Sequence, residues 1–382
     1  MMLVRGYVTA LPSVLTQGCP SFGVRLDLNE VADGQPAGVL AAVRAAADSV
    51  NRYPDPVATA LVERLASRLC VGVQKVAVGC GSTSLCAQLI QATCDQGDEV
   101  VFGWPSFEAY PLLARVARAR PRSVPLTAGH ALDLEAIVAA ITPSTRLIFV
   151  CNPNNPTGTA SRRDELTAFL NAVPRTVLVV LDEAYREFVT DPDVPDGLEF
   201  TAARTNVAVL RTFSKAYGLA GLRVGYAVAA PDVIAALRAV GVPFSVNSVA
   251  QAAAIAALDT TDGMRARCAE IAAGRDRLRA ELVAAGFEVP ASQANFLWLP
   301  LGPHTTAFVE HCRRHNIVIR AIARFGARVT IGTPEQNKDF LSAARSFSMP
   351  SASAAVVDAG VSNKLTLAGT GQHFTNSGDG DG

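Results

Sequence analysis

The sequence predicts an α/β fold in which a mostly parallel sheet carries helices on both faces, together with a smaller α+β domain. Between residues 75 and 230, short and almost entirely apolar runs alternate with helical segments, as at 147–151 and 177–181. Such strands are buried on both faces, which is typical of a parallel sheet covered by helices. After Pro243 the pattern changes to long alanine-rich helices and short strands, which indicates a second unit.

The expected elements follow the changes of hydrophobic period along the chain. Residues 1–30 are expected to be irregular, and Pro54 and Pro56 separate helices expected at 39–50 and 59–69. The strands expected in the large sheet are 76–78, 99–102, 147–151, 177–181, 207–210 and 224–230, with a helix at about 84–94. The smaller domain is expected to hold one or two helices within 249–285, strands at 296–299, 317–319 and 329–331, and helices at 305–315 and 335–347.

These elements predict four parts of the chain. An N-terminal segment, 1–40, is expected to join the smaller domain, and the large domain is expected to span 41–244. The small C-terminal domain is expected to span 245–347. Residues 348–382 are rich in serine, glycine and aspartate and show no period, so they are predicted to be a disordered tail.

The composition bounds the possible partners and the compartment. Lys+Arg and Asp+Glu balance at 34 each, which argues against nucleic acid or an anionic membrane as a partner. No apolar run reaches the ~18 residues of a membrane span, and the N-terminus is a poor signal peptide, so the protein is predicted to be cytoplasmic. The eight cysteines form no CxxC pair; they are expected to be reduced core residues, and no metal site is expected.

Lys215 is the most informative single residue. It lies between the apolar runs 207–210 and 224–230, and only four of the 34 Lys+Arg residues are lysines. A lysine with a lowered pKa can condense with an aldehyde to form a Schiff base, whereas arginine stays protonated. The plainer interpretation is a loop lysine in an ion pair; we favour the catalytic one.

Polar clusters follow the carboxyl ends of four predicted strands, at 79–83, 152–158, 182–185 and 214–215. Ligands of open α/β sheets bind beyond the carboxyl ends of strands, so these clusters predict one site. Glycines and free helix amides at 79–83 suit an anion, and Asp182 suits a protonated ring nitrogen. An asparagine in 152–158 could donate to a phenolate oxygen. Each cluster also has a plainer interpretation as a turn or a helix cap.

Three motifs carry a resemblance to a known family. Asn154–Gly158, Asp182–Tyr185 and Ser214–Gly225 look like the signature of fold-type-I pyridoxal-phosphate (PLP) aminotransferases. More closely, the chain resembles the histidinol-phosphate aminotransferase family, and within it the actinobacterial aromatic amino acid aminotransferases. The segments that carry this closer resemblance are 51–55, 78–82, 103–110 and 293–299. The resemblance covers about residues 25–347 and implies the large PLP domain of fold type I.

The resemblance also implies the roles of individual residues. Lys215, Asp182 and Tyr185 would form the catalytic set: Lys215 would bind PLP and move the proton, and Asp182 would face the pyridinium nitrogen. Tyr185 and Asn155 would hydrogen-bond the ring oxygen. The remaining cofactor contacts would be Phe107, stacked on the ring; Ser82, Thr83, Ser214 and Arg223, around the phosphate; and Tyr53, at the phosphate in the other subunit of a homodimer. The substrate would meet Arg328, through its carboxylate, and Asn29, Asn295 and Arg320.

The sequence departs from the family pattern near the substrate. Val31-Ala32 follows Asn29-Glu30, and Arg320 is followed by alanine and a bulky turn. A surface cation therefore explains Arg320 as well as a substrate contact does.

The predicted function is PLP-dependent transfer of the amino group of phenylalanine, tyrosine or tryptophan to 2-oxoglutarate. The alternative is a histidinol-phosphate aminotransferase, which would need an extra cation for its phosphate, such as Arg320 or Arg324. Two further classes are less favoured: a decarboxylase of phosphothreonine type, which shares the fold, and the sensing domain of a transcription regulator. The second would need a DNA-binding module, and the sequence has no basic region to indicate one.

Overall fold

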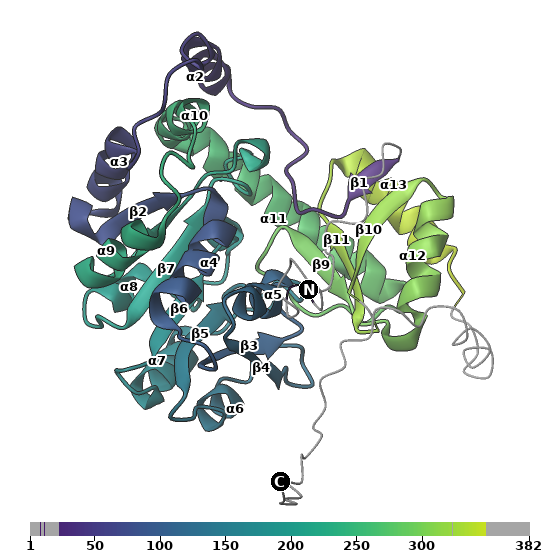
Figure 1. The fold of residues 1–382 in the computed structure, drawn as a ribbon. Helices are drawn as coiled ribbons and strands as arrows, with labels where there is room; N and C mark the ends of the chain where they lie inside the picture. Colours follow the sequence, from purple (N-terminus) through teal and green to yellow (C-terminus); the bar gives the residue numbers. More distant parts are fainter. Residues whose placement is uncertain (1–7, 9–10, 12–22, 323, 349–382) are drawn as a thin grey trace, which may run out of the picture.

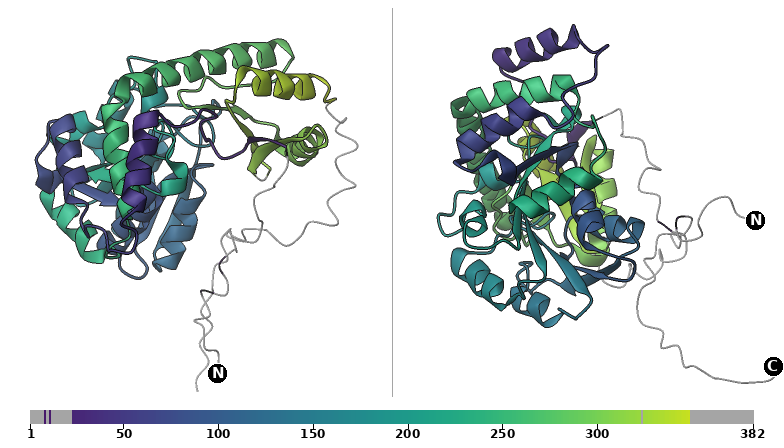
Figure 2. Two further views of the ribbon diagram at one scale, coloured as in Figure 1. Left: turned by 90° about the horizontal axis from the view of Figure 1, so that it is seen from above. Right: turned by 60° about the vertical axis from the view of Figure 1, so that its left-hand side comes forward.

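Two sheets of different size organise the chain (Figure 1). The computed structural model describes residues 23–322 and 324–348, together with positions 8 and 11. The larger sheet has seven strands and the smaller sheet has four. Helix α11 (Thr261–Ala284) contacts elements beside the larger sheet and elements of the part that holds the smaller sheet, and it runs between the two, as Figures 1 and 2 show. Within the described residues, no helix is both long and apolar enough to cross a membrane.

The larger sheet is parallel except for one strand. Its order is β2-β8-β7-β6-β5-β3-β4, and only β8 runs antiparallel to its two neighbours. The strands are β2 (Val76–Gly79), β3 (Glu99–Trp104), β4 (Arg120–Pro125), β5 (Thr145–Cys151), β6 (Leu178–Asp182), β7 (Val207–Thr212) and β8 (Gly225–Val228). This sheet confirms the predicted α/β class.

The central strands are apolar throughout because their alternate residues enter two different cores. Leu147 and Phe149 of β5 pack in one buried cluster with α4, α5 and α9, whereas Ile148 and Val150 pack in another with α6 and α7. Successive side chains of a strand point to opposite faces, so burial on both faces requires a continuous apolar run. The helices of this part are α2 (Ala37–Ala47), α3 (Thr59–Leu69), α4 (Gly81–Thr93), α5 (Ala109–Val116), α6 (Leu134–Ala139), α7 (Arg163–Ala172), α8 (Leu198–Thr201) and α9 (Pro231–Val240), with short 3₁₀ turns η1 (Val73–Lys75), η2 (Arg186–Phe188) and η3 (Ala220–Leu222).

The smaller sheet has the order β1-β10-β11-β9. Strand β1 pairs in parallel with β10, so the N-terminal segment enters this sheet, while β10, β11 and β9 are antiparallel. The strands are β1 (Val24–Leu26), β9 (Phe296–Leu299), β10 (Ile317–Ile322) and β11 (Gly326–Thr330). The helices that follow the larger sheet are α10 (Ser248–Asp259), α11, α12 (Thr305–Arg314) and α13 (Pro334–Arg345), with the turn η4 (Gly302–His304).

Several predicted elements need correction. Strand β4 was not predicted: it is a polar, proline-containing edge strand, and its composition hides the period. Strand β1 lies in the segment expected to be irregular. It was not predicted because its pairing partner is almost 300 residues away. Helix α4 begins at Gly81 rather than at residue 84. The span 249–285 holds two helices that meet at Thr260, which is one of the two outcomes expected for it.

The other predicted boundaries agree to within a few residues. The division into domains at residues 40, 244 and 347 stays a prediction. Residues 349–382, which make up almost all of the predicted tail, lie outside the described residues.

Candidate active site

A pocket of about 540 Å³ lies at the carboxyl ends of β5, β6 and β7 and is closed on one side by the smaller sheet. All predicted site residues except Tyr53 and Asn295 line it: Asn29, Ser82, Thr83, Phe107, Asn155, Asp182, Tyr185, Ser214, Lys215, Arg223, Arg320 and Arg328. Parallel strands end at the same edge of a sheet, so residues far apart in sequence meet here.

Lys215 follows the end of β7 and reaches into this pocket. Its Nζ donates a hydrogen bond to the carbonyl oxygen of Leu28 at 2.8 Å. Although the side chain is only half-buried, surrounding protein atoms lower the pKa of the amine to about 7, and the nearby Arg328 adds to this effect. A large fraction of the amine is therefore neutral near pH 7 and able to act as a nucleophile or a base.

Asp182 is the last residue of β6, and its side chain is buried with one oxygen unpaired. Oδ2 accepts a hydrogen bond from the Tyr110 hydroxyl at 2.7 Å, whereas Oδ1 has no partner among the described residues. Burial raises the pKa of Asp182 to about 6, and the Tyr110 hydrogen bond opposes this rise. An unpaired buried polar group costs ~1–3 kcal/mol. A ligand with a protonated ring nitrogen would supply the missing partner.

Tyr110 is a site residue that the sequence analysis missed. It is fully buried on α5, its ring stacks on Phe149 at 4.3 Å between centroids, and it packs edge-on against Phe107 at 5.3 Å. It therefore supports both the acid at position 182 and the aromatic side chain predicted to cover the cofactor. A tyrosine on an apolar helix face needs a partner for its hydroxyl, which was the available signal.

Arg328 and Tyr185 meet at the side of the pocket formed by the smaller sheet. The guanidinium of Arg328 donates to the Asn155 side chain and to the carbonyl of Asp27, and its Nε has no partner among the described residues. No carboxylate of the described chain forms an ion pair with this buried arginine, which suits it to an anionic ligand. The Tyr185 hydroxyl accepts from Asn29 Nδ2 at 2.9 Å, and burial raises the pKa of Tyr185, so its proton stays available to donate.

The opposite end of the pocket is built to hold an anion. Because α4 begins at Gly81, Ser82 and Thr83 lie in its first turn, where the backbone amides have no partner within the helix. Arg223 donates to the Ser214 hydroxyl at 3.1 Å beside this turn. Gly81 has a φ of 75°, and a Cβ there would lie 2.6 Å from the Arg223 guanidinium, so this approach requires glycine.

Two predicted site residues do not line the pocket. Tyr53 is 85% exposed and packs on Phe244 with 4.9 Å between ring centroids. Asn295 is buried behind Asn29, to whose carbonyl its Nδ2 donates at 3.1 Å. Asn295 therefore positions another pocket residue, and its contact with the substrate stays a prediction.

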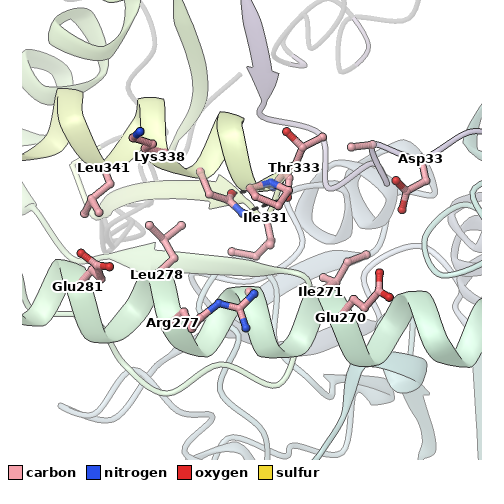
Figure 3. Close-up of a pocket in the computed structure, with 15 residues that line it drawn as sticks. Asp33, Glu270, Ile271, Arg277, Leu278, Glu281, Ile331, Thr333, Lys338 and Leu341 are labelled. Atoms are coloured by element: carbon pink, nitrogen blue, oxygen red, sulfur yellow. Dashed lines mark hydrogen bonds between the residues drawn. The ribbon is translucent and has the colours of Figure 1, made fainter.

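A second hollow, of about 480 Å³, lies between α11 and α13 (Figure 3). Its charged side chains carry both signs, with Glu270, Arg277 and Glu281 on α11, Lys338 on α13, and Asp33 at one end. Of the described residues that line it, none belongs to the predicted site. Similar volume alone therefore does not make this hollow a rival to the pocket around Lys215.

The fold and the pocket together define a class of protein: an enzyme that uses a lysine amine and a buried acid beside an anion-binding helix start. The chain belongs to the class I and II aminotransferase family, described as "Aminotransferase class I and II", which matches residues 23–343. This finding confirms the resemblance to aminotransferases that the sequence motifs carry.

Similar proteins narrow the position within the family. An aromatic amino acid aminotransferase of Rhodococcus jostii is 53% identical over 323 residues, which cover 85% of this chain and 90% of the relative. One from Mycobacterium tuberculosis is 54% identical over 324 residues, which cover 84% and 92%. A histidinol-phosphate aminotransferase of Sinorhizobium meliloti, solved with pyridoxal-5′-phosphate, has a TM-score of 0.84 at 28% identity and covers 90% of this chain and 97% of its own. The family and this structure agree with PLP as the predicted cofactor.

Proposed function

We propose that this enzyme transfers the amino group of an aromatic amino acid to 2-oxoglutarate with PLP as its cofactor. The names of relatives more than 50% identical support the aromatic donor. The observation that carries the proposal is the shared pocket of the Lys215 amine and the open Asp182 Oδ1. The choice of 2-oxoglutarate as the amino acceptor is a prediction of this proposal.

The pocket residues fit this cofactor at each of its polar groups. Asp182 Oδ1 would pair with the ring nitrogen, and Tyr185 and Asn155 would face the ring oxygen. Phe107 would cover the ring, and the phosphate contacts would be Ser82, Thr83, Ser214 and Arg223. When bound, PLP supplies an electron sink for the pair of electrons left when the α-proton of the substrate departs.

Lys215 has two tasks in this proposal. Its amine would hold the cofactor through the cofactor's aldehyde, and Nζ, when free, would take the proton from the α-carbon of the substrate. A pKa of about 7 suits both tasks, because the amine can lose and regain a proton near neutral pH. Asp182, held by the hydrogen bond from Tyr110, would direct its negative charge at the ring nitrogen.

Arg328 is the proposed partner of the substrate carboxylate. It is buried, lacks a carboxylate partner within the described chain, and carries an open Nε. Arginine presents a planar fork that matches a carboxylate. The Asn29 side chain is held in the same pocket by hydrogen bonds with the hydroxyls of Tyr185 and Thr330. Asn295 donates a hydrogen bond to the Asn29 carbonyl and so supports it.

Histidinol-phosphate transfer is the second candidate, since the Sinorhizobium meliloti neighbour carries that name. Arg320, one of the two cations predicted for the phosphate together with Arg324, forms an ion pair of 2.9 Å with Glu108. The names of the relatives more than 50% identical favour the aromatic donor. Comparing kcat/KM for phenylalanine and histidinol phosphate separates the two, and a hundredfold preference for histidinol phosphate would overturn our first choice.

A homodimer completes the proposal, with Tyr53 reaching the phosphate site of the partner. Exposed apolar side chains support it: Tyr53 packs on Phe244, Val57 and Val242 line one hollow, and these four residues are between 42% and 85% exposed. Exposed apolar groups gathered around an aromatic pair are typical of an interface. Light scattering should give the mass of two chains, and a monomer at micromolar concentration would refute this part.

The cytoplasmic location stays a prediction.

The central test concerns Lys215. The purified enzyme is expected to be yellow and to bleach when an amino donor is added. Lys215→Ala should lower kcat at least ~10⁴-fold, because both the covalent link and the base are removed. A Lys215→Ala enzyme that converts substrate at the wild-type rate would refute the proposal.

A further inference from the structure

Arg320 of β10 and Glu108, which precedes α5, form an ion pair across the mouth of the candidate active site. The guanidinium contacts both carboxylate oxygens, with Nη2 at 3.1 Å from Oε1 and 2.9 Å from Oε2, and Nε at 3.2 Å from Oε2. Both residues line the pocket, and each side chain is 42% exposed. The pair therefore lies where a ligand in the pocket can contact it.

Arg320 is also the direct cross-strand partner of Arg328. Residues that oppose each other in an antiparallel pair project to the same face, so two guanidinium groups line one wall of the pocket. Arg328 is buried and open to a carboxylate, whereas Arg320 already has one in Glu108. The charges of Glu108 and Arg320 act on the pKa of Arg328 in opposite directions, as expected for groups that share one site.

The proposed reaction makes opposite demands on this wall. The amino donor brings an uncharged ring, and the dicarboxylic acceptor brings a second carboxylate into the same pocket. A single fixed wall, either neutral or cationic, would favour one ligand and exclude the other. A cation with an exchangeable counter-ion meets both demands, because exposed ion pairs contribute little and are readily exchanged.

We propose that Glu108 is a specificity-determining residue that neutralises Arg320 when an uncharged side chain is bound and releases Arg320 to the distal carboxylate of a dicarboxylic ligand. This inference rests on the proposed function, because it assumes that both kinds of ligand enter the pocket. Glu108 thereby competes with the acceptor for Arg320. It sets the ratio of the affinities for dicarboxylic and aromatic ligands without contacting the reacting atoms.

The test measures binding of two non-reacting ligands to the holoenzyme by titration calorimetry. Glutarate carries two carboxylates, and 3-phenylpropionate carries one carboxylate and a ring. In Glu108→Gln, Arg320 loses its competing anion, so the affinity for glutarate relative to 3-phenylpropionate should rise about fivefold. In Arg320→Gln, the same ratio should fall below the wild-type value by at least that factor.

A matched control uses another exposed pair that joins two elements, Glu281 of α11 with Arg345 of α13 at 2.6 Å, each 52% exposed. Glu281→Gln should leave the ratio at its wild-type value, since this pair lies outside the pocket. An unchanged ratio in Glu108→Gln, or equal weakening of both ligands, would overturn the inference, as would unchanged glutarate binding in Arg320→Gln.

The result is separable from that of the proposed function. If wild-type enzyme fails to transaminate phenylalanine but the ratio shifts as described, the aromatic function fails while the role of Glu108 stands. If phenylalanine is a substrate and the ratio does not move, the function stands and the role of Glu108 is rejected.

Discussion

The two faces of the large sheet hold buried carboxylates in opposite states at the end of β6. On one face, Glu183 accepts from both Arg211 Nε and Nη2 and from the Gly197 amide, and Arg211 also pairs with Asp196. On the other face, its neighbour Asp182 has one donor, Tyr110, and one oxygen with no partner among the described residues.

This contrast separates structural charge from functional charge. A buried ion pair with all its hydrogen bonds made has no capacity left for a ligand, whereas a buried acceptor left open costs free energy that a ligand can recover. Burial raises the pKa of both acids, and Arg211 opposes that rise for Glu183. Proximity in sequence therefore says little about role, and the state of the hydrogen bonds says much.

Among the effects that test this contrast, the largest is expected on catalysis at Asp182. Asp182→Asn keeps the shape of the side chain but removes the charge that faces the ring nitrogen, so kcat should fall about 10³-fold. The apoenzyme should keep its thermal stability, because the substitution also removes a buried charge that has an oxygen without a partner among the described residues. Steady-state kinetics and thermal melting of the apoenzyme measure the two quantities. Activity within tenfold of wild type would contradict the functional assignment.

The next effect is on stability at Glu183. Glu183→Gln leaves Arg211 with a weaker partner in a buried site, so the free energy of unfolding should fall by about 3 kcal/mol. Urea denaturation measures it. Glu199→Gln, which disrupts an exposed ion pair with Arg163, is the control and should change the free energy of unfolding far less. If Glu183→Gln unfolds like wild type but loses activity, the comparison between the two faces fails.

A smaller effect is expected at Tyr110. Tyr110→Phe removes only the hydrogen bond to Asp182, so the pKa of Asp182 should rise and kcat/KM should fall about tenfold. The acidic limb of the pH profile should move to higher pH, which a loss of packing alone would not cause. Tyr217→Phe, another buried tyrosine outside the pocket, is the control and should leave that limb in place.

The last effect concerns the apoenzyme alone, in the pH dependence of its stability. The pKa of Asp182 is about 6 in the folded chain and near 3.8 in the unfolded one, so between these values the folded state binds more protons. Stability from this group is therefore present at low pH and is lost as pH rises from about 4 to 6, by roughly 1 kcal/mol per pH unit. Comparing wild type with Asp182→Asn in the slope of unfolding free energy against pH isolates the contribution of Asp182, and identical slopes would contradict its raised pKa.

Much of the site could be predicted from strand ends. Asp182, Asn155 and Lys215 each follow an apolar run, and parallel strands bring such positions to one edge. The edge strand β4 could not be recognised, because exposure leaves it polar and free to contain proline. Strand β1 was missed because three residues carry no period of their own and pair with a strand far along the chain.

The sequence by itself determined the alternation of doubly buried strands and helices, and hence the edge at which a lysine and an acid would meet. Period and composition are local properties, and they specify which faces must be buried. Only the tertiary structure decided which charges are satisfied. It leaves Asp182 Oδ1 open, joins Glu108 to Arg320 across 212 residues and places Tyr110 behind the acid. These pairings depend on distances between elements, which a sequence pattern does not contain.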